Sequence, residues 1–127
     1  MLYLISYDIP DDRRRTKLAK ALKDWSGGPL FIIFAMMHSK DPAGFLKPLA
    51  GAAQAIFAIP IPGEDGSYSA EESARLSQEG GIMVSPAESL EHALSLIAAQ
   101  GGPAGRILIC GSLYLAGSVL SREKEIT

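Results

Sequence analysis

Cysteine, long apolar runs and net charge are all scarce in this sequence, and each scarcity excludes a class of protein. The single Cys110 cannot build a disulfide framework, which fits a protein of the reducing cytosol. No apolar run reaches the roughly 18 residues that a membrane-spanning helix needs. The opening stretch MLYLISYDIP contains no basic residue and leads into acidic ones, unlike a secretory signal peptide. We therefore expect a cytoplasmic protein that does not enter a membrane.

The charges nearly cancel, with 12 basic and 14 acidic residues and a formal net charge of -2. This balance gives no global electrostatic reason to expect a nucleic-acid partner. The distribution is uneven, however, since six of the basic residues fall within residues 1–25: Arg13, Arg14, Arg15, Lys17, Lys20 and Lys23. Two interpretations stay open, a solvated helix face or a face that binds phosphate.

Phosphate-binding and metal-binding motifs are missing as well. The sequence has no G-x-x-x-x-G-K-[ST] loop and no G-x-G-x-x-G after its first apolar run, where DIPDD stands instead. His38 and His92 are far apart and have no Cys or His at a ligand spacing, so we expect no metal site. His92 lies next to an apolar helical stripe and is expected to be an ordinary surface or boundary histidine. Cys110 ends an apolar run without an evident base, which favours a small core residue over a nucleophile.

What the sequence does contain is an alternation of apolar runs and helical patterns. Strands are expected at 2–9, 29–37, 55–61, 81–85 and 106–110, because these runs are short, apolar and rich in β-formers. Helices are expected between them and after the last one. Their signals are a cap at Asp11 or Asp12, Asp41-Pro42, the capping box Ser69-x-x-Glu72, the stripe Leu90, Ala93, Leu94 and Ile97, and the inward positions Leu113, Ala116, Val119 and Leu120.

This order predicts the fold class. Strands separated by helices pair in parallel through right-handed crossovers, which gives an α/β fold, a three-layer α/β/α sandwich. With 127 residues, 47% of them hydrophobic, the chain is expected to form a single domain over 1–127 that ends in a polar tail at 122–127. Pro48 is expected to shorten or kink the helix that begins at Pro42.

Three candidate sites lie at expected strand ends, where open α/β sheets bind ligands. Gly111-Ser112 follows the last strand, and a helix N-terminus there would suit a carboxylate or phosphate. Ser112 is either a ligand-binding hydroxyl or only an N-cap. In HSKDP, residues 38–42, Lys40 could pair with an anion, and Asp41 is either part of a site or only a cap. Asp8 ends the first strand and is a weak signal alone.

Five segments together resemble a known family: FAMMHSKDPAGFLKPLA, IFAIPIPGE, SAEE, SLEHAL and RILICGSLYLAG. Over about residues 29–121 they are similar to the C-terminal, Mur-ligase-type domain of folylpolyglutamate synthase/dihydrofolate synthase. The resemblance implies a Rossmann-like, five-stranded, mostly parallel sheet in the order 1-5-2-3-4. It also implies ATP and Mg as the parent family's cofactors, Ser112 near the glutamate, and Lys40-Asp41 near the interdomain cleft.

The sequence departs from that family at two places. The family's D-G-A-H-N-P segment at the first strand-to-helix turn is replaced by YDIPDDRRR, so neither histidine nor asparagine is available there. The N-terminal ATPase domain with its phosphate loop is not present in this sequence. We therefore expect no catalytic residue and no bound cofactor in this chain alone, with any binding of glutamate or nucleotide being vestigial.

The replacing segment resembles a second family. MLYLISYDIPDDRRRTKLAKALKDW, residues 1–25, is similar to the start of the small CRISPR-associated endoribonuclease of the spacer-acquisition complex. In that family the strand-end aspartate, here Asp8, belongs to a metal site formed across a dimer. The rest of its ferredoxin-like fold, with a second strand of the form Q-x-S-V-F, does not follow here.

Two families thus meet near Ser26, and a chimera is the simplest explanation. The foreign element at 1–25 would complete the ligase-like part at 26–121 by burying Leu4, Leu18, Leu22 and Trp25, while Asp8 and Arg13 to Arg15 stay exposed. Three functions remain open: an inactive ligase-like domain, a metal-dependent endoribonuclease, and a stand-alone glutamate-binding or nucleotide-binding module. The chain is expected to be a monomer or a weak homodimer.

Overall fold

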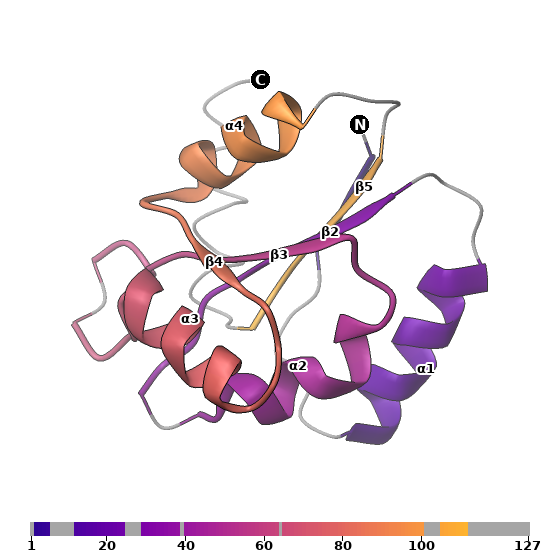
Figure 1. Ribbon diagram of the computed structural model, residues 1–127, viewed down its shortest axis with the longest axis horizontal. Coiled ribbons are helices and arrows are strands. Elements are labelled where there is room, and N and C mark those ends of the chain that lie inside the picture. The colour runs from indigo at the N-terminus through magenta and orange to yellow at the C-terminus, as the bar shows by residue number, and fades with distance from the viewer. Residues whose placement is uncertain are drawn as a thin grey trace.

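Five parallel strands form one sheet in the order β1-β5-β2-β3-β4 in the computed structural model of the protein (Figure 1). The structure describes residues 2–5, 12–24, 29–38, 40–63, 65–100 and 105–111. The strands are β1 (Leu2–Ile5), β2 (Leu30–Phe34), β3 (Ala55–Ala58), β4 (Ser85–Pro86) and β5 (Arg106–Cys110). The predicted sheet order and the parallel pairing are both confirmed.

Helices cover both faces of this sheet, as the three-layer prediction requires. Four lie within the described residues: α1 (Asp12–Asp24), α2 (Pro42–Ala50), α3 (Ala70–Glu79) and α4 (Leu90–Ala99). Figure 1 shows α1, α2 and α3 on one face and α4 on the other. The expected last helix and the polar tail at 122–127 lie outside the described residues.

β2 holds the two layers together because it is buried on both faces. Its side chains alternate: Leu30, Ile32 and Phe34 enter the core beneath α2 and α3, while Phe31 and Ile33 enter the core beneath α4. All five positions of the strand are buried. A strand with apolar neighbours on both sides needs no polar alternation, which is why this segment reads as one continuous apolar run.

The predicted caps are present at two helix starts. Ser69 Oγ accepts from the Glu72 N–H at 3.1 Å, and Glu72 Oε1 accepts from the Ser69 N–H at 3.2 Å, so the capping box of α3 is confirmed. Asp41 is the N-cap of α2 and Pro42 its first residue. The start of β5 at Arg106 and its end at Cys110 also match the prediction.

β4 is the largest correction to the expected elements. A strand was expected at 81–85, but pairing begins only at Ser85. Gly81 has a φ of +89°, and the Ile82 N–H donates to the Ser77 carbonyl at 2.9 Å, so this stretch is tied to the end of α3 instead. Pro86 is tolerated because β4 lies at the edge of the sheet, where one side of the strand needs no partner.

β2, β3 and α2 also end at residues other than those expected. β2 ends at Phe34, and two residues beyond it the Met36 carbonyl accepts the Tyr68 N–H. β3 ends at Ala58, two residues before Pro60, which has no N–H to donate. α2 continues past Pro48 to Ala50, so the proline does not end it. A proline in the last turn of a helix removes only one hydrogen bond.

The segment expected to be foreign is part of the same sheet. β1 pairs with β5 from Leu2↔Arg106 to Ile5↔Ile109, and α1 packs against α2 with Leu18 and Ala19 on the shared core. Leu18 packs against the core as predicted, but it is half-buried and not fully buried. The predicted burial of Leu4, Leu22 and Trp25 falls outside the side chains that the structure describes, as do residues 6–9 of the expected first strand.

Candidate functional site

The carboxyl ends of β2 and β5 lie side by side, and this edge is the candidate site. The two strands pair through Phe34↔Cys110, and the Ala35 N–H donates to the Cys110 carbonyl at 3.4 Å. In parallel sheets, loops at these ends are the ordinary place for a ligand. The structure therefore brings the segment ending in Gly111 and the segment leading to Lys40 and Asp41 to one edge.

Gly111 is the residue that allows β5 to end here. Its φ is +109°, a conformation that residues with a Cβ rarely adopt. A Cβ at this position would also overlap the carbonyl oxygen of Ala35. Glycine is thus required twice, by conformation and by the close approach of the β2 backbone. Ser112, the predicted hydroxyl, lies outside the described residues, as does Asp8.

Asp41 begins α2 but does not cap it with its side chain. Its carbonyl accepts the Phe45 N–H at 3.0 Å, whereas its carboxylate makes no capping hydrogen bond. A Cβ on Gly44 would lie 2.6 Å from Asp41 Oδ2, so the absence of a side chain at Gly44 leaves room for this carboxylate against the first turn. Asp41 is therefore the N-cap of α2 by its position and its backbone, without a capping hydrogen bond from its side chain.

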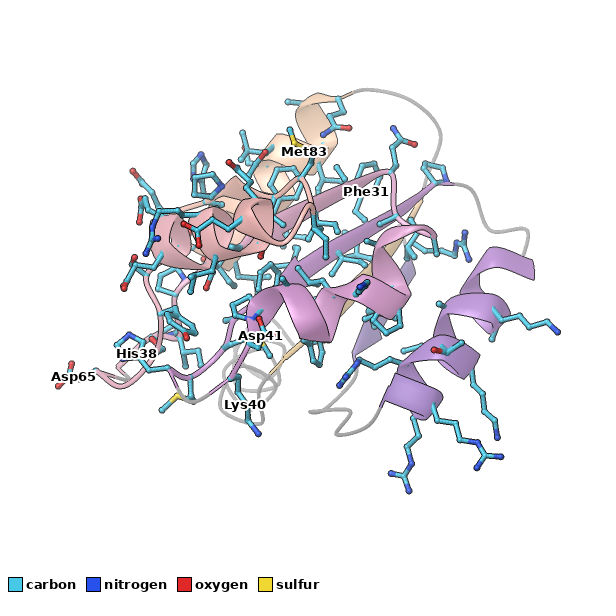
Figure 2. All side chains as sticks on the ribbon, turned by 60° about the horizontal axis from the view of Figure 1, so that its bottom comes forward. Phe31, His38, Lys40, Asp41, Asp65 and Met83 are labelled. Carbon is cyan, nitrogen blue, oxygen red and sulfur yellow. The ribbon has the colours of Figure 1, made fainter. Side chains whose placement is uncertain are left out.

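Lys40 lies beside it and is exposed. Its backbone N–H donates to the Met37 carbonyl at 3.0 Å in a tight turn. Figure 2 shows the Lys40 side chain extending outward below the start of α2, with Met83 on the opposite side of the molecule.

Tyr68 holds this loop in place, a role that no pattern in the sequence indicated. Its hydroxyl lies 2.9 Å from the carbonyl of His38 and 3.0 Å from that of Lys40, and can donate to either. Its ring meets the His38 imidazole edge to face, with centroids 4.8 Å apart. The His38 N–H donates to the Gly66 carbonyl at 2.9 Å, which adds a backbone link. The contact spans 28 to 30 residues, so no local pattern could reveal it.

Tyr68→Phe is expected to lower the free energy of unfolding by about 1 kcal/mol, since it removes one hydrogen-bond donor and keeps the ring. Urea denaturation of the wild type and the variant measures the difference. Tyr68→Leu, which also removes the ring, should cost more. Equal stability of the wild type and the Phe variant would show that the hydroxyl does not hold the loop.

Two titratable groups near the edge have shifted pKa values. Hydrogen bonds from Ser69, from its N–H and its hydroxyl, lower the pKa of Glu72, and the charges of His38 and Arg75 lower it further. Burial raises the pKa of the Cys110 thiol to about 12, so this group stays protonated at neutral pH. Cys110 is therefore a buried core residue here, with 1% of its surface exposed, and not a nucleophile.

The basic residues of α1 divide into two kinds. Arg13, Arg14, Lys17 and Lys20 are exposed. Arg15 is not, which corrects the expectation that Arg13 to Arg15 are all exposed. It is 8% exposed, and its guanidinium carbon lies 5.0 Å from the centre of the Phe45 ring. The cause is the packing of α1 against α2, which turns one arginine inward to form a cation–π contact.

The described residues contain neither a metal cluster nor a membrane span. No three His, Cys, Asp or Glu side chains gather there in a group that could hold a metal ion. Within the same parts of the chain no helix is long and apolar enough to cross a bilayer. A shallow pocket of about 210 Å³ opens at the amino end of β3, away from the candidate edge. It is lined by Ala50, Ala53, Gln54, Ala55, Ile56, Gly81, Ile82 and Met83.

Comparison with known proteins gives two different results for the two parts of the chain. Residues 1–28 match the family model of CRISPR associated protein Cas2. The CRISPR-associated endoribonuclease Cas2 3 of Synechocystis sp. is 45% identical over 40 residues, which is 32% of this chain and 44% of that protein. The chain thus matches less than half of this curated relative.

Solved structures resemble the chain over nearly its whole length. The folylpolyglutamate synthase of Mycobacterium tuberculosis complexed with ADP has a TM-score of 0.75 at 20% identity, covering 93% of this chain and 28% of that one. The FolC protein of E. coli in complex with ADP has a TM-score of 0.72 at 20% identity, covering 91% and 27%. A bifunctional folylpolyglutamate synthase/dihydrofolate synthase with Mn, AMPPNP and L-glutamate bound has a TM-score of 0.67 at 20% identity, covering 94% and 28%.

These matches confirm the α/β fold that the sequence predicted, which resembles the Mur ligase C-terminal domain of these synthases. They also extend it. A match over 91% of 127 residues cannot fit into the part of the chain after residue 28, so it includes part of the Cas2-like segment. The chain spans less than a third of each synthase.

Proposed function

We propose that this chain is a ligase-like domain of the folylpolyglutamate synthase type, completed by a Cas2-like strand and helix, and that it does not join glutamate to folate by itself. The observation that carries the proposal is the five-stranded order β1-β5-β2-β3-β4, matched at a TM-score of 0.75 over 93% of the chain. The sequence supports the second half, because it has no phosphate loop that could hold ATP for acyl-phosphate formation.

The edge formed by β2 and β5 is the part of the chain proposed to retain a binding role. Lys40 and Asp41 stand at the start of α2, and Gly111 follows β5 against the backbone of Ala35 at the end of β2. A carboxylate held there would lie near an ammonium group and near the N–H groups that begin a helix. When bound, ATP and Mg²⁺ would supply the activated phosphate in the parent reaction, and Lys40 would hold an anionic substrate group in place. Ser112, which follows Gly111 in the sequence, is proposed as a further hydrogen-bond donor because the resemblance to the synthases implies that it lies near the glutamate.

Incubation of the protein with ATP, Mg²⁺, glutamate and tetrahydrofolate is expected to leave the folate unextended and the ATP unconsumed. Catalysis needs groups that position and stabilise the transferred phosphoryl group, and the chain has no motif of that kind. Mass spectrometry of the folate and a phosphate-release assay measure both products. A complete synthase, such as the E. coli enzyme, serves as the active control, and extended folate made by this chain would contradict the proposal.

A second candidate function is a stand-alone glutamate-binding or nucleotide-binding module. The observation that favours it is the exposed Lys40 at the sheet edge, together with the glutamate and nucleotide complexes of the structural neighbours. Titration calorimetry with glutamate and with ATP distinguishes the two candidates. Binding that is lost in Lys40→Ala but kept in Lys47→Ala, an exposed lysine at the other end of α2, would favour the module.

A third candidate, a metal-dependent endoribonuclease, rests on the Cas2 match to residues 1–28. It requires Asp8 carboxylates to meet across a dimer built by a ferredoxin-like fold. In the structure β1 instead pairs in parallel with β5 of the ligase-like sheet. Incubation of a fluorescent RNA with Mg²⁺ or Mn²⁺ tests this candidate, and we expect no cleavage. Cleavage that Asp8→Ala abolishes would support it.

A further inference from the structure

In α4, a histidine lies three residues after the N-cap serine, the position that a glutamate holds in α3. Ser89 is the N-cap of α4, and its Oγ accepts from the His92 N–H at 3.0 Å. In return His92 Nδ1 accepts from the Glu88 N–H, also at 3.0 Å. The imidazole thus satisfies a backbone donor just before the helix, much as the Glu72 carboxylate does for the Ser69 N–H in α3.

We propose that this arrangement is a pH-sensitive helix cap, in which His92 holds the Glu88 N–H only while its imidazole is neutral. A neutral imidazole has one acceptor nitrogen, whereas a protonated imidazole has two donors and no acceptor. The contact with the Glu88 N–H therefore becomes donor against donor as the ring gains a proton. Among the side chains, histidine is the one whose charge ordinarily changes between pH 5 and 8.

His92 Nδ1 is the acceptor that the structure gives to the Glu88 N–H. The charged side chains beside it are Glu88, just before the helix, and Glu91 in its first turn. The sheet face beneath α4 contributes apolar side chains, among them Phe31, Ile33 and Ile107. The two glutamates can favour the charged ring, but the N–H of Glu88 points at Nδ1. A cation at the start of α4 also opposes the helix dipole.

The capping box of α3 is an internal control in the same molecule. Hydrogen bonds from Ser69 hold the pKa of Glu72 below its ordinary value of 4.5, so its carboxylate remains an acceptor at pH 5.5. Ala87 is a second control, because its N–H donates to the Ala58 carbonyl at 2.8 Å and does not depend on the imidazole. Only the Glu88 N–H should respond to protonation of His92.

Nuclear magnetic resonance of the whole chain between pH 7.5 and pH 5.5 tests the proposal. At pH 7.5 we expect the His92 ring to carry its proton on Nε2, with Nδ1 unprotonated. As the pH falls, the Glu88 amide proton should shift in step with the His92 ring. Its exchange with water, corrected for the intrinsic rate, should become roughly fivefold faster, as expected for the loss of one helix cap. The amides of Ala87, Ser69 and Glu72 should keep their protection.

Two variants separate His92 from the other histidine. His92→Gln retains an acceptor at every pH, and its Glu88 amide should show no pH response. His38→Gln should leave the Glu88 response unchanged. A proton on Nδ1 at pH 7.5, equal Glu88 protection at both pH values in the wild type, or a response that persists in His92→Gln would each overturn the proposal.

Discussion

Gly111→Ala is expected to lower the free energy of unfolding by about 3 kcal/mol or more. Two costs combine at this position. A residue with a Cβ is strained at a φ of +109°, which costs roughly 1–3 kcal/mol. The new Cβ would also overlap the Ala35 carbonyl oxygen, so the ends of β2 and β5 must move apart, at a further cost of roughly 1–3 kcal/mol. Chemical denaturation of the purified variant measures the total.

Two other glycines provide matched controls for this prediction. Gly63 also has a positive φ, of +76°, but nothing lies within 4 Å of the place where its Cβ would be. Gly63→Ala should therefore show the conformational cost alone, about 1 kcal/mol. Gly51 has a φ of -66° and open space, so Gly51→Ala should be neutral or slightly stabilising. If all three variants behaved alike, the close approach of β5 to β2 would not matter to stability.

Phe45→Ala is expected to cost about 3–5 kcal/mol, a large share of the roughly 5–15 kcal/mol available to a domain. Phe45 is 4% exposed, belongs to the core under β2 and lies beneath the Arg15 guanidinium of α1. Truncation leaves a cavity at the place where the Cas2-like segment meets the ligase-like part. Thermal and urea unfolding measure the loss. Met83→Ala, at a side chain that is 83% exposed, should change stability by less than about 0.5 kcal/mol.

The contact between Arg15 and Phe45 can be measured separately by a double-mutant cycle. Arg15→Ala and Phe45→Leu, alone and together, should give an interaction free energy of about 0.5–2 kcal/mol, the range for a cation over an aromatic ring. The matched control is Arg14→Ala with Phe45→Leu, because Arg14 is exposed. An interaction energy no larger than that of the control would mean that α1 does not dock through Arg15.

The fold could be predicted from the sequence because its strongest signals are local. The run PLFIIFAMM indicated a strand covered on both faces, and Ser69-x-x-Glu72 fixed the start of α3. The strand order followed from resemblance rather than from pattern. The start of β4 was predicted wrongly because Ile82, Met83 and Val84 are residue types typical of strands. In the structure, a hydrogen bond from the Ile82 N–H to the Ser77 carbonyl and the positive φ of Gly81 prevent strand pairing there.

The candidate site could be predicted only in part. Lys40, Asp41 and Gly111 were identified from their places at strand ends, and the structure does bring these ends to one edge. Tyr68 and Arg15 act through contacts with residues some 30 positions away, so no spacing in the sequence indicates them. The sequence does contain a pattern that indicates the role of His92. Ser89-x-x-His92 has the spacing of a capping box, with an imidazole in place of the carboxylate.

The two resemblances are compatible because a strand followed by a helix is a transferable unit. The Cas2-like segment supplies β1 and α1, which the synthase-like sheet requires at its edge beside β5. An apolar strand of the right length can fill that position whatever its origin, provided that its helix covers the adjoining core. Leu18, Ala19 and Arg15 are among the side chains of α1 that make this contact.

Nuclear Overhauser contacts between β1 and β5 test most directly whether the Cas2-like segment is a structural part of the ligase-like sheet. We expect contacts between backbone protons of Tyr3 and Ile107 and of Leu4 and Leu108, in the parallel register, at the spacing of neighbouring strands, about 4.8 Å. Selective labelling of these residues in the intact protein makes the contacts assignable. Absence of any contact between the two strands, or contacts in an antiparallel register, would contradict the proposed fold.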